Sequence, residues 1–357
     1  MSENAQRVVR TELITPGPSQ ALANLLGTDI PSDELPALWH WIHLLEKRPH
    51  ADLGPDGHPT FGIPAPPGPG RKRMFAGGRV STLALLVFGK PATRTTWVAD
   101  TVEKQGSTGP LTFVTVRNEY VQDGRVCIVD ENDIVYRTAG SSLAMQAGTL
   151  QDEPEQAPRE PALTLTADEA LLFRFSALTY NAHRIHYDHN WVRKEGYSDL
   201  VVHGPLQALM MGELVRRSGD GLVGKRFAYR LVAPMIGSQT FTVLAAADGV
   251  NAGVEARDVH GTVTAVGTVG PIDPEQSEVA AMPFDYSVEA ARYDVTRGGQ
   301  ERVQAAAVAI AELVPHPGTL LDVAGGTIIV SNRIAAHGLI PAGETSFVAV
   351  GQRGEPA

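Results

Sequence analysis

The chain has 357 residues, of which 43% are hydrophobic and 20% are charged, a composition typical of a globular protein with about two or three domains. It has 30 Lys and Arg against 40 Asp and Glu, a formal charge of −10 that argues against nucleic-acid binding, because phosphate contacts need an excess of basic residues. The single cysteine, Cys127, excludes an intramolecular disulfide and any multi-cysteine metal site.

No apolar run approaches the ~18–20 residues that a membrane-spanning helix needs. Residues 1–12 are polar and of mixed charge, and they contain no apolar signal-peptide core. We therefore expect a cytoplasmic protein with no membrane partner.

Proline, glycine and charge divide the chain. Gly54–Gly70 is rich in proline and glycine, which excludes regular helix or strand there. Gln151–Pro161 is acidic and proline-rich and is typical of an exposed linker, and a weaker break lies near Gly270–Pro283. We predict a first domain at 1–150, a linker at 151–161, a second domain at 162–282 and an extension at 283–357.

The first domain opens with two helical patterns. Ser19 is expected to cap a helix whose leucines share one face, and residues 38–45 repeat apolar side chains at helical spacing behind Pro36. Later, residues 111–120 and 125–137 are rich in β-branched and aromatic residues, and the Asp-Gly pair between them indicates a hairpin. Helices followed by an antiparallel sheet predict an α+β fold.

The second domain contains a predicted helix, residues 205–217, that begins at a proline and ends in basic residues followed by glycine. Strand-like segments follow at 227–233, 239–246 and 254–268. Because most of the helix is apolar, we expect the sheet to wrap around it.

Three histidines, His183, His186 and His189, lie three residues apart, and His203 follows. Spacing alone leaves a solvated loop open as an interpretation. A metal site would need three converging ligands, and the local carboxylates do not form a recognised ligand spacing. We therefore predict no metal and no cofactor.

The sequence His203-Gly204-Pro205 places a glycine at the start of the predicted helix. Backbone N–H groups there have no intrahelical acceptor and, with the helix dipole, form a site for a developing oxyanion. An upstream histidine supplies an acid and base near neutral pH. The combination suits proton chemistry beside a carbonyl or thioester.

Residues 180–188 (YNAHRIHYD) and 202–206 (VHGPL) resemble the hydratase motif of the hot-dog enzymes, and residues 73–78 (RMFAGG) and 133–137 (DIVYR) resemble the N-terminal half of the same proteins. Within that MaoC-like superfamily, the chain is most similar to type 2 3-hydroxyacyl-thioester dehydratases and mesaconyl-CoA hydratases. The resemblance covers about residues 10–270. It implies a double hot-dog fold, in which antiparallel sheets wrap a central helix, and a carbon–oxygen lyase.

The resemblance also implies roles for residues. His186 matches the catalytic histidine, and Gly204 matches the residue whose backbone N–H polarises the thioester carbonyl. Asn181 stands where broader hydratases carry an aspartate; an amide cannot act as a base, so it is expected to orient the water or hydroxyl. His183 and His189 are expected to be structural or solvent-facing, and Asp188 to orient His186 or cap a turn.

By the same resemblance, residues 74–80 of the first half align with residues 202–206 of the second, but Gly77 and Gly78 are poor helix formers. A degraded central helix would leave room for the acyl group, which implies one active site per chain. The alternative is that the first half only covers the sheet edge of the second half.

The extension, residues 283–357, resembles a truncated start of a class I S-adenosylmethionine-dependent methyltransferase, with an alanine-rich helix and then residues 319–327 (TLLDVAGGT). Two of the three glycines of that family's loop are replaced, by Ala324 and Ile328. We therefore expect a short α/β remnant without bound methyl donor.

The predicted reaction is reversible hydration of an α,β-unsaturated acyl thioester, carried by coenzyme A or an acyl carrier protein, as in fatty acid metabolism. A hot-dog thioesterase and a non-catalytic acyl-binding partner remain alternatives. A homodimer is plausible because it would cover sheet edges.

Overall fold

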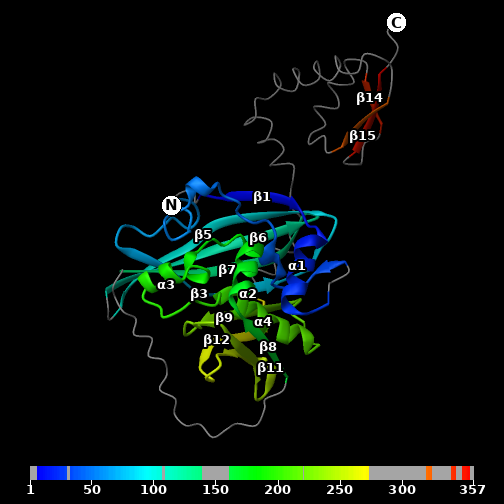
Figure 1. Ribbon diagram of the computed structural model, residues 1–357. Helices are drawn as coiled ribbons and strands as arrows, with labels where there is room; N and C mark the ends of the chain where they lie inside the picture. Colours follow the sequence, from blue (N-terminus) through cyan, green and yellow to red (C-terminus); the bar gives the residue numbers. More distant parts are fainter. Residues whose placement is uncertain are drawn as a thin grey trace. The chain divides into compact units, whose positions relative to one another are not determined.

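The chain divides into two compact units, residues 1–282 and 283–357, which are described separately (Figure 1). None of the helices in the described part of the chain is long and apolar enough to cross a membrane. The computed structural model describes residues 6–29, 33–106, 109–138, 161–219 and 221–272, and three C-terminal strands at 319–323, 339–342 and 348–353.

The first half of the large unit contains one α-helix and the long strands of the sheet. Its strands β6 and β7 form the predicted hairpin, with Asp123 and Gly124 in the left-handed region (φ 51° and 73°). The elements are β1 (Val8–Leu13), α1 (Pro16–Leu26), β2 (Glu34–Leu35), the 3₁₀ helices η1 (Trp39–Ile42) and η2 (His50–Asp52), β3 (Arg71–Thr82), β4 (Leu86–Val87), β5 (Pro91–Gly106), β6 (Gly109–Gln122) and β7 (Arg125–Thr138).

The second half repeats this order and adds a buried helix. The predicted strand at 254–268 is wrong as a single element, because a turn at Asp258–Gly261 divides it into β11 and β12. The elements are β8 (Ala162–Ala167), α2 (Glu169–Thr179), η3 (Arg184–His186), α3 (His189–Lys194), α4 (Gly204–Arg217), β9 (Lys225–Leu231), β10 (Gln239–Ala246), β11 (Gly249–Arg257) and β12 (Val263–Pro271).

One ten-stranded antiparallel sheet joins the halves. Its order is β1-β5-β6-β7-β3-β9-β12-β11-β10-β8, so β3 pairs with β9 at the centre. From the outer edge inward, the strands are β1, β5, β6, β7 and β3 in the first half and β8, β10, β11, β12 and β9 in the second. Each half thus has its first strand at the outer edge and its next long strand at the centre, and α1 and α2 each follow the edge strand of their half. This internal repeat confirms the predicted double hot-dog architecture.

Helix α4 is the central helix of the second half, as predicted. Every residue from Leu206 to Val215 is buried, and the helix packs against β8 through β12. Two of these residues are polar and bonded: Gln207 accepts a hydrogen bond from Thr264 (2.7 Å), and Glu213 accepts one from Trp39 Nε1 of the first half (2.9 Å). The helix therefore sits in the core with its polar groups satisfied.

The described part of the first half has no counterpart of α4. Between α1 and β3 it contains only η1 and η2 as helical elements. The predicted alignment of residues 74–80 with the start of α4 is wrong, because these residues lie in β3, which corresponds to β9. The packing of β3 against β9 requires a glycine at position 77, because a Cβ there (φ 149°) would lie 2.3 Å from the carbonyl oxygen of Tyr229.

Two helix predictions need correction. Helix α1 begins at Pro16 with Thr15 as the N-cap, so Ser19 lies inside it and bonds His43 Nε2 (3.1 Å) instead. The second predicted helix shortens to η1, because Leu38 and Leu44 adopt positive φ angles of 70° and 50°.

In the C-terminal unit, β13 (Thr319–Val323), β15 (Val348–Arg353) and β14 (Leu339–Ala342) form an antiparallel sheet. A parallel sheet with crossover helices would be needed for the predicted α/β start of a methyltransferase, so the pairing of β13 contradicts that expectation. The expected helix after residue 283, the loop at 324–328 and residues 151–160 of the predicted linker lie outside the described residues.

Candidate active site

His186 is buried, with 7% of its surface exposed, at the end of η3. Its Nδ1 lies 2.7 Å from the carbonyl oxygen of Val201. A carbonyl can only accept, so Nδ1 carries the hydrogen and Nε2 keeps its lone pair. Burial lowers the pKa of His186 to about 4, against a smaller opposite effect of the Val201 hydrogen bond. The side chain is therefore a neutral base near pH 7.

His203 is a partner of His186 that the sequence did not reveal. The two rings stack with centroids 3.6 Å apart at 17°. His203 Nε2 bonds Ser176 Oγ (2.8 Å), and burial lowers the pKa of His203 well below its usual value. The sequence signal for a role of His203 was its position directly before Gly204, because His203 is the N-cap residue of α4.

Asn181 lies just beyond α2, whose C-cap residue, Tyr180, is in the left-handed region (φ 52°). The backbone N–H of Asn181 donates to Ser176 O (2.8 Å), and its side-chain Oδ1 accepts from the N–H of His183 (3.0 Å). The NH₂ group is available to donate to a ligand, and Oδ1 keeps a second lone pair that can accept.

Gly204 is the first residue of α4, so its N–H belongs to the turn that lacks intrahelical acceptors. The close approach at this glycine is made by the protein itself: a Cβ would lie 2.1 Å from Leu231 Cδ1. The Leu231 side chain therefore packs directly against this glycine. The neighbours His203 and Pro205 both line the pocket described next.

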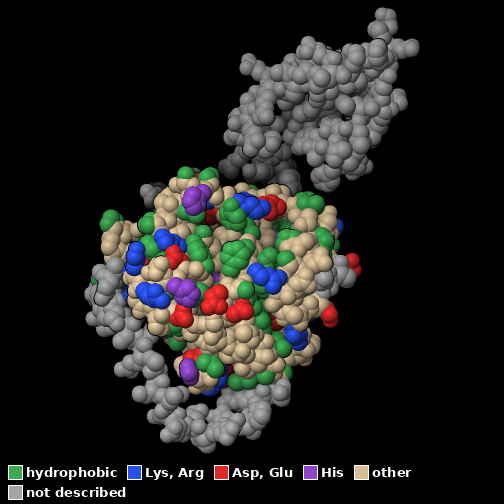
Figure 2. Space-filling view, in the orientation of Figure 1, with side chains coloured by type: hydrophobic (Ala, Val, Ile, Leu, Met, Phe, Trp, Pro, Cys, Tyr) green, Lys and Arg blue, Asp and Glu red, His purple; other side chains and the backbone are tan. Residues whose placement is uncertain are grey.

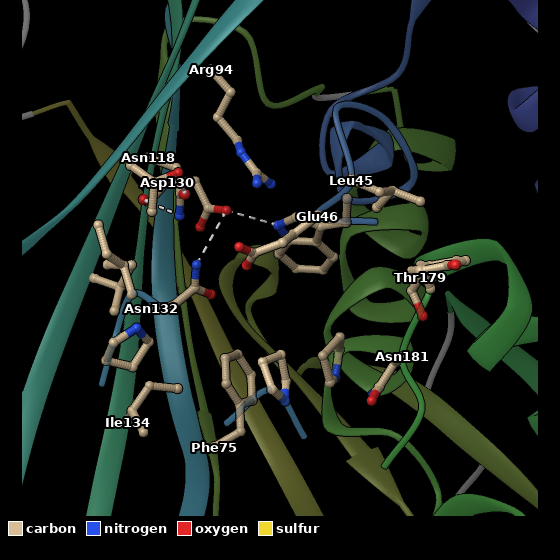
Figure 3. Close-up of a pocket in the computed structure, with 18 of the residues that line it drawn as sticks. Leu45, Glu46, Phe75, Arg94, Asn118, Asp130, Asn132, Ile134, Thr179 and Asn181 are labelled. Carbon is tan, nitrogen blue, oxygen red and sulfur yellow. Dashed lines mark hydrogen bonds between the residues drawn. The ribbon is translucent and has the colours of Figure 1, made fainter. Parts of the chain in front are cut away.

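A cavity of about 390 Å³ lies between the two halves. From the second half it is lined by Thr179, Asn181 and His203. From the first half, Arg94, Asn118, Asp130 and Asn132 face it across the gap (Figure 3). His186 is not among the lining residues, but its ring stacks on that of His203, which is. The structure thus brings Asn181 and the start of α4 to one cavity, with His186 next to its wall.

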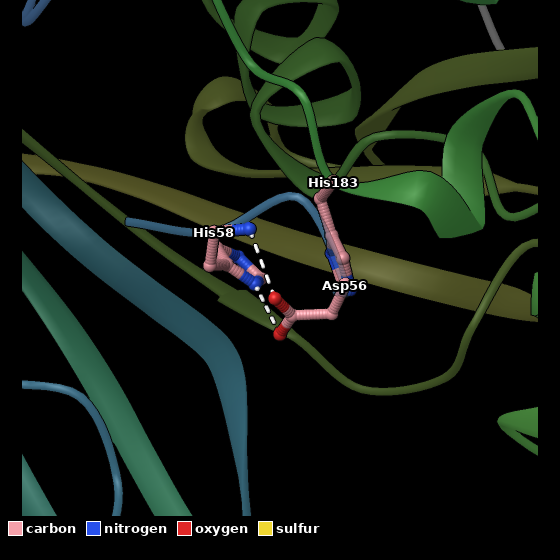
Figure 4. Close-up of side chains that lie close together, drawn as sticks. All are labelled: Asp56, His58 and His183. Carbon is pink, nitrogen blue, oxygen red and sulfur yellow. Dashed lines mark hydrogen bonds and ion pairs between the residues drawn. The ribbon is translucent and has the colours of Figure 1, made fainter. Parts of the chain in front are cut away.

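A second cluster lies beside His186. Asp56 Oδ2 bonds His58 Nδ1 (3.0 Å), and the His58 and His183 rings are 4.0 Å apart (Figure 4). These three side chains could hold a metal ion by residue type and proximity. Burial acts to raise the pKa of Asp56, but the His58 hydrogen bonds outweigh it and lower this pKa to about 2. Burial and the neighbouring His58 and His186 lower the pKa of His183 to about 2.

The loop that carries Asp56 is clamped to the loop that carries Asn181 and His186. The N–H of Arg184 donates to Asp56 O (2.9 Å). A Cβ at Gly57 would lie 1.8 Å from the carbonyl oxygen of Ala182, so the two backbones are in direct contact. The first half therefore positions the candidate catalytic loop.

The remaining residues of the motif have local partners. Asp188 caps α3 by accepting from Asn190 N (2.9 Å) and Trp191 N (3.0 Å), and its pKa is lowered chiefly by a hydrogen bond from Arg184. His189 is half-exposed and pairs with Asp199 (3.0 Å).

Basic and acidic side chains are interspersed on the face shown in Figure 2. Three consecutive basic residues, 71–73, make internal contacts: Lys72 pairs with Glu195, Arg71 donates to Thr112 (2.7 Å), and Arg73 donates to Pro64 O (3.2 Å).

Comparison with known sequences supports one family. The family model described as hydroxyacyl-thioester dehydratase type 2 matches residues 38–237. The mesaconyl-C(4)-CoA hydratase of Chloroflexus aurantiacus is 41% identical over 247 residues, covering 68% of this chain and 86% of that protein. The mitochondrial hydroxyacyl-thioester dehydratase type 2 of Schizosaccharomyces pombe is 27% identical over 130 residues, covering 36% of this chain and 42% of that protein.

Solved structures support the fold. HtdX of Mycobacterium tuberculosis matches with a TM-score of 0.52 at 14% identity, covering 75% of this chain and 100% of that one. A MaoC-like dehydratase matches with a TM-score of 0.50 at 12% identity, covering 75% and 98%. None of these matches supports the expected methyltransferase likeness of the C-terminal extension.

Proposed function

The chain belongs to the hydroxyacyl-thioester dehydratase type 2 family and is a lyase of the hydratase/dehydratase type, and from this premise we propose that His186 is its acid and base, with Asn181 and the N–H of Gly204 as its partners. The observation that carries the proposal is the bond from His186 Nδ1 to Val201 O (2.7 Å). It leaves Nε2 as the acceptor, and the buried ring is neutral at physiological pH.

In hydration, Nε2 of His186 takes a proton from water while the water oxygen bonds to C3 of the enoyl thioester. The π electrons of the C2–C3 bond move toward the thioester carbonyl, whose oxygen gains negative charge. The imidazolium then returns the proton to C2, so water is added and no other reactant is needed. Dehydration is the same path reversed.

The charge on the carbonyl oxygen is assigned to the N–H of Gly204. This N–H lies at the positive end of the α4 dipole, where it needs no rearrangement to donate. Asn181 lines the cavity and offers its NH₂ group to the water or hydroxyl oxygen. Removing a proton shuttle or an oxyanion donor of this kind typically costs about two to three decades in rate.

Coenzyme A is the proposed carrier, because the 41% identical relative is named for a coenzyme A thioester. An acyl carrier protein is the alternative carrier.

We propose the cytoplasm as the location, since Cys127 is a buried free thiol of the kind that a reducing compartment preserves. We also propose a homodimer, since β1 and β8 end the ten-stranded sheet and offer edges for pairing; light scattering of the purified protein tests it.

The test is an assay of purified protein with crotonyl-CoA and mesaconyl-C4-CoA, following enoyl-thioester absorbance together with free thiol. Wild type should lose absorbance without thiol release, and His186→Gln should lose at least about 100-fold in kcat/KM. His189→Gln is the matched control, because His189 lies in the same segment but is exposed and paired with Asp199. Thiol release would indicate a thioesterase, and undiminished turnover by His186→Gln would refute the assigned role.

A further inference from the structure

The inner face of the first half has a polar floor where the second half has α4. Arg94 and Thr96 of β5, Asn118 and Tyr120 of β6, and Asp130 of β7 all line the cavity. They are neighbours in register, with Arg94 opposite Tyr120 and Asn118 opposite both Thr96 and Asp130. A cavity for an alkyl chain alone would be lined by apolar side chains, so this floor points to a polar group on the ligand.

Most of the charged side chains that line the cavity have partners within the protein. Arg10 pairs with Glu46 (3.0 Å), and both line the cavity. Asp130 is 1% exposed, and its Oδ2 accepts from Trp41 Nε1 (3.0 Å), with His40 Nε2 and Asn132 Nδ2 each 3.4 Å away. The protein thus supplies donors to the acidic side chain of the floor.

Arg94 has no such compensation. Within the described residues, no carboxylate lies within the 4.0 Å of an ion pair from its guanidinium, and its buried Nε has no hydrogen-bond partner. Tyr120 lies opposite Arg94 in the register of β5 and β6, and the Arg94 charge acts to lower the pKa of its phenol. Burial raises the pKa of Tyr120 to about 12, so the phenol keeps its hydrogen and can donate it onward. In Figure 3 the Arg94 guanidinium points into the cavity.

We propose that Arg94, with the hydroxyl of Tyr120, forms a carboxylate-binding subsite that selects acyl thioesters whose acyl group carries a second, free carboxylate. This inference rests on the proposed hydratase function and names the substrate class of the same cavity. A guanidinium can hold a carboxylate through two parallel N–H···O bonds, which gives both affinity and orientation. The free carboxylate would lie at the first-half end of the cavity, with the thioester at Gly204.

Asp130 is expected to oppose Arg94 in binding a ligand carboxylate. Among the described residues its buried Oδ1 has no hydrogen-bond partner, and Asp130 lines the same cavity as Arg94. A ligand carboxylate on Arg94 would be repelled by this charge, so Arg94 and Asp130 act in opposite directions on an acidic acyl group. A neutral acyl group would feel neither effect strongly.

The test compares acidic and neutral substrates of matched shape: fumaryl-CoA with crotonyl-CoA, mesaconyl-C4-CoA with 3-methylcrotonyl-CoA, and trans-2-hexenedioyl-CoA with trans-2-hexenoyl-CoA. The readout is the ratio of kcat/KM for the acid to that for its neutral partner. We expect wild type to prefer the acid in at least one pair, and Arg94→Gln to lower that ratio about 10- to 100-fold. Arg94→Lys should retain part of it, and Asp130→Asn should raise it.

Arg117→Gln is the matched control, because Arg117 lies on β6, is paired with Glu119 (2.9 Å) and Glu131 (3.3 Å), and does not line the cavity. The subsite is refuted if wild type prefers no acid, or if Arg94→Gln leaves every ratio as in Arg117→Gln. A folding defect lowers both members of a pair and leaves the ratio intact. Hydration of neutral substrates that requires His186 would show that the proposed function stands even if the subsite fails.

Discussion

The contact between Gly57 and Ala182 joins the first half to the candidate catalytic loop, and Gly57→Ala tests it. The added Cβ would lie 1.8 Å from Ala182 O and 2.6 Å from Ala182 C. These are backbone atoms, so no side-chain rotation relieves the overlap, and the two loops must separate. Gly57 also has φ 89°, a conformation that residues with a Cβ rarely adopt.

The two costs can be added. A left-handed conformation costs a residue with a Cβ about 1–2 kcal/mol, and forced overpacking adds typically about 1–3 kcal/mol. We therefore expect Gly57→Ala to lower the free energy of unfolding by about 2–5 kcal/mol. We also expect kcat/KM to fall, since Ala182 directly follows Asn181 and a displacement of about 1 Å at a catalytic group can cost 100-fold.

Gly70→Ala is the control for the backbone term alone. Gly70 ends the same proline-rich segment with φ 71°, and a Cβ there would meet nothing within 4 Å. Urea unfolding and kcat/KM are measured for both variants. Equal unfolding midpoints and equal activities for the two variants would show that the Gly57–Ala182 contact neither stabilises the protein nor positions the site.

Three further expectations concern protons, a buried carboxylate and metal ions. Burial lowers the pKa of His186 to about 4, so kcat/KM should be level from about pH 6 to 8 and fall as the pH drops through about 4. The unfolded histidine binds its proton below about pH 6.5 and the folded one only below about 4, so His186 alone should lower stability by roughly 3 kcal/mol across that window as the pH is lowered. His183 and His203 act in the same direction, so urea unfolding should show a total fall of at least this size. Glu213→Ala should cost about 1–3 kcal/mol, because it leaves the buried Trp39 Nε1 (2.9 Å) without its acceptor, whereas Arg216 is partly exposed and can be solvated; an unchanged urea midpoint would contradict this. Dialysis against a chelator should leave activity intact, since Asp56 is already hydrogen-bonded to His58, and activity that depended on restored Zn²⁺ would overturn the prediction of no metal.

The sequence predicted elements whose signals are local. Helix α4 combines a proline at its start, basic residues in its last turn and a glycine beyond it, and the structure has the helix at Gly204–Arg217. The Asp123-Gly124 turn was also predictable from its own residues, because few other residue pairs accept the positive φ angles of this turn. The turn between β11 and β12 also had a local signal that we missed: Asp258 accepts from His260 N (2.9 Å) and Thr262 N (2.8 Å).

Other features depend on contacts that no local pattern encodes. The spacing in residues 38–45 suits an α-helix and a 3₁₀ turn alike, and the positive φ angles at Leu38 and Leu44 decide between them. For the site, the motif indicated Asn181 and His186 and the helix start indicated Gly204. The opposite wall, with Arg94 and Asp130, comes from strands β5 and β7, which have no sequence link to the motif.

The pairing of β3 with β9 places two hot-dog halves in a single polypeptide. Two identical chains that pair in this way must share every substitution, so a change that empties one half also empties the other. Within one chain, each half accumulates its own substitutions. That freedom permits one half to carry a central helix and the motif at 180–188 while the described part of the other half has no such helix and lines the cavity with its sheet. The cavity therefore has two different walls, one from each half.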